Sequence, residues 1–273
     1  MKKLLLFLLP WALWADYLFV FYDVGETVAL MPVVEALRER GEEVRVIALE
    51  RGDRYASVEV CEKAPDVLVV GDASRAQLQY VQAFRGSSKT VCYYDNALEI
   101  DRIPYADLIR EFEQAVDWFL VPSQKAAASS VVDAIVVGNP DMDCFEEGVG
   151  AYEEIPGRVV YFGGYDDDYE EAFQAALMHF PEAIVYPHPR TEGRLERSYG
   201  AQIGEASSLQ AIGEAETVVI HRSSIGVKAA LAGKNVWIVE ADGAVKLLKL
   251  TRETLGIPRD ATGLICRLLH EES

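Results

Sequence analysis

Two short polar segments in the second half of the chain contain residue types that bind phosphate. His188 and Arg190 lie in HPR after one apolar run, and Ser223 and Ser224 lie in HRSSIG between another apolar run and a helical pattern. A guanidinium and an imidazole donate charge-assisted hydrogen bonds to anions, and a helix start adds free N–H groups. Together these four residues predict one anion site. The alternative is that one serine caps the helix and that His188 is a turn residue.

Other residues near these segments extend the predicted site. His221 or Arg222 is an optional further anion ligand, because both precede the serine pair. Gly163 and Gly164 follow an apolar run, and their missing side chains would let the backbone approach a nucleotide closely. The carboxylates of 166–168 are the oxygen ligands that Mg²⁺ prefers, but three consecutive side chains point in different directions. We therefore interpret them as a solvated helix start and predict no metal site.

These residues must be positioned by an alternation of strands and helices. The predicted strands are 17–22, 44–49, 66–70, 90–94, 118–121, 134–137, 159–162, a run that ends at 187, 217–221 and 235–240. Helical patterns lie between several of them, as at 28–40, 169–180 and 225–232. Such alternation favours parallel sheets, in which ligands bind where the strands end.

The first strand leads into the sequence DVGE, where Gly25 and Glu26 form a candidate loop near the ligand. A glycine there permits close approach of the backbone to a ligand or a helix, so a plain tight turn is an equal alternative. The sequence does not match the GxGxxG pattern of dinucleotide-binding proteins.

The alternation of predicted strands and helices is interrupted between residues 139 and 156. We therefore expect an α/β protein with two Rossmann-like domains facing across a cleft, divided at this linker. The predicted segments are a signal peptide at 1–15, an N-terminal Rossmann-like domain at 16–140 and a C-terminal Rossmann-like domain at 157–273. The signal peptide is indicated by Lys2 and Lys3, an apolar run at 4–9 and alanine at position 15. Its alternatives are a mis-assigned start and a buried helix.

The composition excludes several functions. The formal net charge is −18, from 44 acidic and 26 basic residues, which argues against a surface that binds nucleic acid or anionic lipid. The four cysteines are scattered without the spacing of a zinc site. Buried thiols are the simplest interpretation, and export would make one or two disulfides compatible with the cysteine count.

The segments GNPDMD at 138–143, HPR at 188–190 and HRSSIGVKAALAGKNVWIV at 221–239 resemble GT-B glycosyltransferases and related transferases. The group includes bacterial sialyltransferases, polysaccharide transferases and CDP-glycerol glycerophosphotransferases. In these families a similar HP motif and a serine pair bind the donor phosphate. The resemblance implies a GT-B-like fold and a nucleotide-activated sugar or polyol donor, with no cofactor and no required metal. It also implies a glycan or cell-envelope acceptor, with 16–140 as the acceptor-side domain and 157–273 as the nucleotide donor domain.

The resemblance also places Asp95 where the sialyltransferase group has an acidic base. A carboxylate there would take the proton of an acceptor hydroxyl. The chain departs from that motif at Asn96 and Ala97, so Asp95 as a solvated turn residue or helix cap stays open. Lys228 occupies the place where many GT-B enzymes hold a glutamate against the donor ribose, and lysine cannot accept those hydrogen bonds.

Three functions follow from these residues. The first is a metal-independent transferase that moves a sugar or polyol phosphate from a nucleotide-activated donor to a hydroxyl. The second is an exported two-lobed binding protein without catalysis, periplasmic or in the cell envelope, which the signal peptide favours. The third is an enzyme like a nucleotide-sugar epimerase, which leaves HPR without a role.

Overall fold

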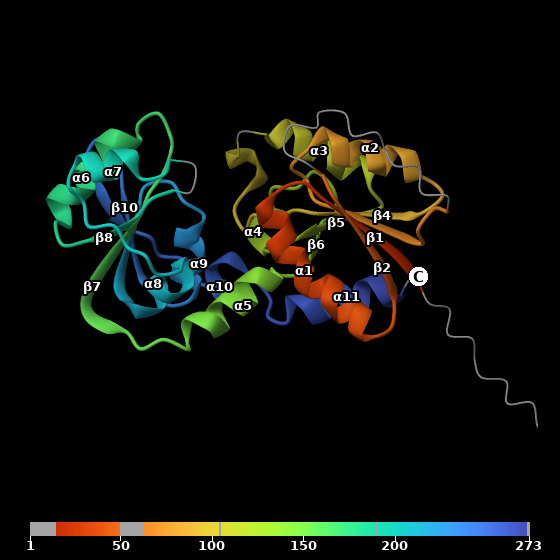
Figure 1. Ribbon diagram of the computed structural model, residues 1–273. Helices are drawn as coiled ribbons and strands as arrows, with labels where there is room; N and C mark the ends of the chain where they lie inside the picture. The colour runs from red at the N-terminus through yellow and green to blue at the C-terminus, as the bar shows by residue number, and fades with distance from the viewer. Residues whose placement is uncertain (1–14, 50–62, 104, 189–190, 272–273) are drawn as a thin grey trace, which may run out of the picture. The chain divides into compact units, whose positions relative to one another are not determined.

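The computed structural model describes residues 15–49, 63–103, 105–188 and 191–271. The chain divides into two compact units, and each is an α/β domain built on its own sheet (Figure 1). The first unit comprises residues 1–140 and 257–273, and the second comprises 141–256. The predicted signal peptide lies outside the described residues except for Ala15. Within the described residues, no helix combines the length and apolar character needed to span a bilayer.

The first unit contains a six-stranded parallel sheet in the order β2-β1-β3-β4-β5-β6. Its strands are β1 (Asp16–Phe21), β2 (Glu43–Ala48), β3 (Val67–Val70), β4 (Lys89–Tyr93), β5 (Trp118–Val121) and β6 (Ile135–Val136). All six residues of β1 are buried, as expected for an inner strand covered on both faces. Hydrophobic side chains on the two faces of the sheet form separate clusters under the helices.

Helices connect these strands, as the alternation in the sequence predicts. They are α1 (Val24–Glu39), α2 (Arg75–Phe84), the 3₁₀ turn η1 (Ile100–Arg102), α3 (Ala106–Ala115) and α4 (Gln124–Ala127). Asp23 caps α1 by accepting a hydrogen bond from the backbone N–H of Glu26, and the Ser74 side chain caps α2. Each cap closely follows the carboxyl end of a strand, so these side chains determine where the two helices begin.

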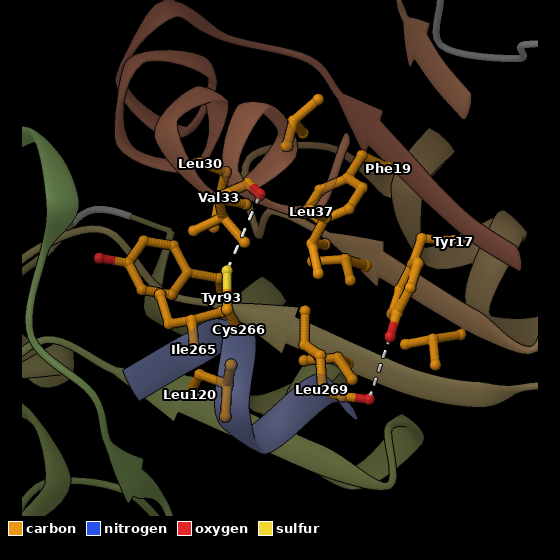
Figure 2. Packing of buried hydrophobic residues seen from close by; sticks show 14 of the residues in the cluster. Tyr17, Phe19, Leu30, Val33, Leu37, Tyr93, Leu120, Ile265, Cys266 and Leu269 are labelled. Carbon is orange, nitrogen blue, oxygen red and sulfur yellow. Dashed lines mark hydrogen bonds between the residues drawn. The ribbon is translucent and has the colours of Figure 1, made fainter. Parts of the chain in front are cut away.

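The C-terminal helix α11 (Ala261–Glu271) belongs to the first unit, which corrects the predicted second domain of 157–273. Its apolar face packs against α1 and the sheet (Figure 2), where Ile265 and Leu269 are almost fully buried. The turn beneath it needs Gly138, whose φ is +82° and where a Cβ would lie 2.9 Å from both the Pro258 carbonyl oxygen and the Ala261 Cβ. Helical spacing in the sequence predicts that this helix has an apolar face. It does not indicate which of the two domain cores that face packs against.

Replacing Leu269 by alanine should lower the free energy of unfolding of the first unit by about 2–5 kcal/mol, because it empties a packed site in the core. Urea unfolding followed by fluorescence measures the change. Arg267→Ala on the exposed side of the same helix is the matched control, with an expected change below about 0.5 kcal/mol. Equal effects of the two substitutions would contradict the placement of α11.

The second unit contains a five-stranded sheet in the order β11-β10-β9-β7-β8, parallel except for β11. Its strands are β7 (Ile155–Phe162), β8 (Ile184–Tyr186), β9 (Ala215–Ile220), β10 (Asn235–Val239) and β11 (Val245–Leu247). Its helices are α5 (Pro140–Val149), α6 (Tyr169–His179), α7 (Arg194–Ser198), α8 (Ser208–Glu214), α9 (Ile225–Leu231) and α10 (Arg252–Leu255).

The predicted linker at 139–156 is largely a helix. Helix α5 fills most of it, and the acidic side chains of Asp143 and Glu146 form ion pairs with Arg252 of α10. These contacts join α5 to the second unit, which begins at Asp141. Proline in the first turn and acidic residues near a helix start favour a helix, so the polar composition of this segment does not indicate a linker.

Candidate functional site

Each sheet carries a polar group of residues where its parallel strands end. In the first unit we call this group the acidic edge, and it consists of Asp23, Glu26, Asp72 and Asp95. These residues follow β1, β3 and β4, which are neighbours in the sheet. In the second unit we call it the histidine edge, and it follows β7, β8 and β9. Its residues are Gly163, Gly164, His188, His221, Arg222, Ser223 and Ser224.

Glu26 is the best-defined residue of the acidic edge. Its Oε1 accepts hydrogen bonds from the backbone N–H groups of Tyr22 and Asp23 and, at 2.7 Å, from Nε2 of Gln77. Its Oε2 is buried without a hydrogen-bond partner and lies against Gly71, where a Cβ would overlap it. Gly25 and Glu26 thus lie in the first turn of α1 and not in the predicted loop, and Glu26 connects the turn after β1 to α2.

Burial raises the pKa of Glu26 to about 8, from an ordinary value of 4.5. Above about pH 4.5 the unfolded chain has released this proton while the folded protein keeps it. Unfolding then releases a proton, so this residue makes the free energy of unfolding fall as the pH rises from about 4.5 to about 8. Below this range the contribution does not change with pH.

Glu26→Gln should remove that dependence, because glutamine accepts the same hydrogen bonds and does not ionise. The variant should gain stability relative to the parent by up to about 1.4 kcal/mol per pH unit within this window. Urea unfolding at several pH values between about 4.5 and 8.5 measures the difference between the two proteins. A difference that stays constant over the range would contradict the raised pKa.

Asp72 and Asp95 complete the acidic edge. Asp72 is 3% exposed, and its Oδ2 has no hydrogen-bond partner. Burial raises its pKa well above the usual range, and the charges of Asp95 and Glu26 raise it further. The carboxylate of Asp95 lies beside Gly25, where a Cβ would meet its Oδ2, and the Asn139 side chain binds its backbone carbonyl. The Asp95 carboxylate in this position thus leaves no room for a side chain at Gly25.

In the histidine edge, the turns after β7 and β8 are packed together. A Cβ on Gly163 would lie 2.8 Å from the Tyr169 hydroxyl, 2.9 Å from Oε1 of Glu196 and 3.0 Å from the backbone nitrogen of His188. Crowding by these protein atoms therefore explains why residue 163 is a glycine. The His188 ring contacts the ring of Tyr165, with 4.5 Å between centroids. The backbone at His188 therefore lies beside Gly163.

His221 and Arg222 are committed to partners within the second unit. His221 is buried, with Nδ1 2.8 Å from the Val239 carbonyl and Nε2 3.2 Å from Oδ1 of Asp168. Arg222 forms an ion pair with Asp168 at 2.7 Å. The hydrogen bond from His221, aided by the charge of Arg222, lowers the pKa of Asp168. The optional role of His221 as an anion ligand is thus wrong. Asp168, which the sequence analysis interprets as part of a solvated helix start, binds both His221 and Arg222.

The serine pair follows β9, and His188 follows β8, with β7 between them in the sheet. The two segments therefore do not follow neighbouring strands, and they are separated by two strand spacings, about 9–10 Å. Ser224 occupies the cap position of α9, but its side chain makes no capping hydrogen bond. Arg190 lies outside the described residues.

Two further sequence expectations concern polar residues away from the edges. The Lys228 side chain forms an ion pair with Asp141. Among the described cysteines, Cys92, Cys144 and Cys266 are free thiols. No group of three or more histidine, cysteine, aspartate or glutamate side chains within the described residues is arranged to hold a metal ion.

Sequence reasoning missed two buried carboxyl residues at the strand-end edges. Asp72 follows β3 and Gly71. A glycine shortly after a strand also singles out Gly25, so the same pattern could have identified Asp72. Glu196 is fully buried beneath the turn after β7, where its Oε1 accepts a hydrogen bond from the Tyr169 hydroxyl at 2.8 Å. Only the packing of α7 against that turn reveals Glu196, because its sequence context is that of an exposed helix.

Comparisons with known proteins identify the fold. No family model and no curated protein sequence matches the chain. Solved structures do match. The chain has the fold of the GT-B glycosyltransferases and their relatives, with two Rossmann-like α/β domains.

Three of these structures illustrate the degree of structural similarity. A protein from Listeria monocytogenes described as a putative UDP-N-acetylglucosamine 2-epimerase has a TM-score of 0.59 and 12% identity over 82% of this chain and 79% of its own. The wall teichoic acid polymerase TagF has a TM-score of 0.52 and 10% identity, over 82% and 70%. The glycotransferase of kitacinnamycin has a TM-score of 0.52 and 12% identity, over 95% and 90%.

Proposed function

We propose that the protein is a glycosyltransferase-like enzyme that moves a sugar or polyol phosphate from a nucleotide-activated donor to a hydroxyl acceptor, without a required metal. The observation that carries the proposal is the contrast between the two strand-end edges. The acidic edge offers carboxyl groups that can accept a proton, and the histidine edge offers donors that can bind a phosphate.

The donor phosphate would bind at the histidine edge. His188 and the serine pair stand on either side of the turn after β7, so a phosphate group would lie over the backbone near Gly164. Ser223 and Ser224 each provide a hydroxyl. The Ser224 hydroxyl makes no capping hydrogen bond to α9 that would compete with a phosphate. The sequence adds Arg190 two residues after His188.

The acceptor hydroxyl would bind at the acidic edge, where Asp95 is the proposed base. Asp95 takes the hydroxyl proton while the acceptor oxygen forms a bond to the transferred group. The bond from that group to the donor phosphate breaks at the same time. The leaving nucleotide keeps the bonding electrons, and its charge is stabilised by the donors of the histidine edge.

A second candidate is an enzyme like a nucleotide-sugar epimerase. It is favoured by the structural likeness to the protein described as a putative UDP-N-acetylglucosamine 2-epimerase. Both candidates require nucleotide binding in the second unit. They differ in that the epimerase needs no separate acceptor and releases no free nucleotide.

Titration calorimetry with CDP, UDP, ADP and GDP tests the proposal. One nucleotide should bind with a Kd in the micromolar range, at least about tenfold more tightly than the others. Supplying the matching nucleotide sugar with a hydroxyl acceptor should then release free nucleotide, whereas the epimerase candidate predicts conversion without release. If none of the four nucleotides binds, the enzyme proposal fails and the non-catalytic binding protein is supported.

For localisation, we propose export to the periplasm or cell envelope, based on the sequence of residues 1–15. N-terminal sequencing of the protein from its natural cells should then begin at Asp16, the first residue of β1. Loss of the preceding residues would leave the strand intact. An intact Met1, or a start at any later residue, would contradict the proposal.

A further inference from the structure

Arg222 is the guanidinium that the structure describes at the histidine edge, and the proposed reaction gives it no role. Its Nη1 and Nη2 donate hydrogen bonds to the carboxylate of Asp168, at 3.2 and 2.7 Å, while 56% of its side chain stays exposed. A guanidinium carries five N–H donors in one plane, and this pair occupies two of them. The remaining donors, which include the Nε–H and an Nη–H along the next side of the plane, can therefore bind a second anion.

Asp168 is itself held by a buried histidine. His221 is 2% exposed, and its ring lies with Nε2 3.2 Å from Oδ1 of Asp168 and Nδ1 2.8 Å from the Val239 carbonyl oxygen. Both partners accept hydrogen bonds, so both ring nitrogens donate when these bonds are made. The hydrogen bond from His221 and the charge of Arg222 lower the pKa of Asp168, so its carboxylate stays ionised beside the guanidinium.

Arg222 thereby reaches the turn after β7, over which the donor phosphate is proposed to lie. Asp168 directly precedes Tyr169, the first residue of α6, and the Tyr169 ring packs against Gly164, where a Cβ would lie 3.1 Å from it. The same turn carries Asp166, whose Oδ2 would lie 3.7 Å from that Cβ. A phosphate here would face this carboxylate, so a cation from a neighbouring turn is needed to hold it. Arg222 supplies that cation from the turn after β9.

We propose that Arg222 is a ligand of the donor phosphate and that Asp168 is the residue that positions it. The proposal rests on the proposed function, because it adds two residues to the same phosphate site. An unsupported arginine side chain samples many rotamers and loses that freedom when it binds an anion. The pair with Asp168 removes most of this cost in advance, because it fixes the plane of the guanidinium before the phosphate arrives.

Titration calorimetry on the full chain, with inorganic pyrophosphate and with CDP, UDP, ADP and GDP, tests the ligand role. Arg222→Ala should weaken the binding of pyrophosphate and of the preferred nucleotide about tenfold or more, because a charge-assisted hydrogen bond is lost. The matched control is Arg158→Ala. Arg158 forms an ion pair with Glu214 in the same unit, four residues before the carboxyl end of β7, and its loss should change Kd less than about twofold.

Arg222→Ala also uncovers the charge of Asp168, and a double variant removes this ambiguity. Arg222→Ala combined with Asp168→Asn keeps the net charge of the parent and should still bind pyrophosphate at least about fivefold more weakly. Arg222→Lys keeps a cation beside Asp168 but loses the planar fork, and it should weaken binding at least about threefold. Parent-like affinity of either variant would overturn the ligand role.

The positioning role of Asp168 has a test in which charge alone predicts the opposite sign. Asp168→Asn removes a negative charge near the bound anion, so electrostatics alone would tighten binding. Asparagine can still accept the hydrogen bond from His221, but its amide cannot form the two-oxygen pair with Arg222. We therefore expect Asp168→Asn to weaken pyrophosphate binding at least about threefold. Unchanged or tighter binding would overturn the positioning role, and if this variant does not fold, Arg222→Lys still decides the ligand role.

Pyrophosphate separates this proposal from the proposed function, because it has the phosphates of the donor without its base or sugar. If pyrophosphate binds with the expected dependence on Arg222 and no nucleotide binds, the transferase fails and the phosphate ligand stands. If a nucleotide binds and the Arg222 variants bind it as tightly as the parent, the phosphate ligand fails and the transferase stands. Binding of neither probe would overturn both.

Discussion

Replacing Asp95 by asparagine should lower the rate of group transfer about 10²–10⁴-fold and change the nucleotide Kd less than twofold. Asparagine keeps the size of the side chain beside Gly25 but cannot take a proton from the acceptor hydroxyl. The nucleotide Kd is preserved because Asp95 belongs to the first unit, whereas the proposed phosphate site lies in the second. Release of free nucleotide from the donor in the presence of acceptor measures the rate.

The control for this variant is Asp107→Asn, which removes one exposed carboxylate from the same unit. It should retain the parent's rate, which excludes an effect of net charge alone. Thermal unfolding of both variants checks that the first unit remains folded. An Asp95→Asn protein that is folded and keeps more than a third of the parent's rate would rule out Asp95 as the base.

Replacing His188 by alanine should weaken nucleotide binding about tenfold or more. One charge-assisted hydrogen bond contributes about 1.5–3 kcal/mol, which corresponds to a factor of ten or greater in Kd. From the sequence we expect an effect of the same size for Arg190→Ala and a smaller one for Ser224→Ala. Titration calorimetry with the preferred nucleotide measures all three.

The matched control is His179→Ala, at the exposed C-terminal end of α6 in the same unit. Helix α6 runs back from the strand ends, so His179 lies away from the histidine edge, and its loss should leave the Kd unchanged. If His188→Ala and His179→Ala bind nucleotide equally well, His188 is a turn residue in contact with the Tyr165 ring and has no part in the phosphate site.

The strands could be predicted from the sequence because they are continuous apolar runs in parallel sheets. The run at 118–121 is β5 with the predicted bounds, and β1 is displaced by one residue from 17–22. Burial on both faces makes such runs unambiguous. The order of the strands in each sheet could not be predicted in this way, because it depends on how the helices cross the sheet. The interposition of β7 between β8 and β9 is therefore visible only in the structure.

The candidate sites show the same limit. His188 and Gly163 could be associated from the sequence, because each follows a strand. The partners of His221 could not, because Asp168 approaches it from another turn, 53 residues away in the chain. Likewise, Asp72 is unusual only through its burial beside Glu26, which the packing of three strand ends produces. Single motifs indicate residue chemistry, and only tertiary contacts show which groups are already satisfied.

The most direct measurement of the central claim is a crystal structure of the protein with its preferred nucleoside diphosphate bound. The account predicts that the phosphates lie over the turn after β7, within hydrogen-bond distance of His188 and of the hydroxyl or backbone N–H of Ser223 or Ser224. A diphosphate bound elsewhere, with His188 and both serines making no contact to it, would contradict the account.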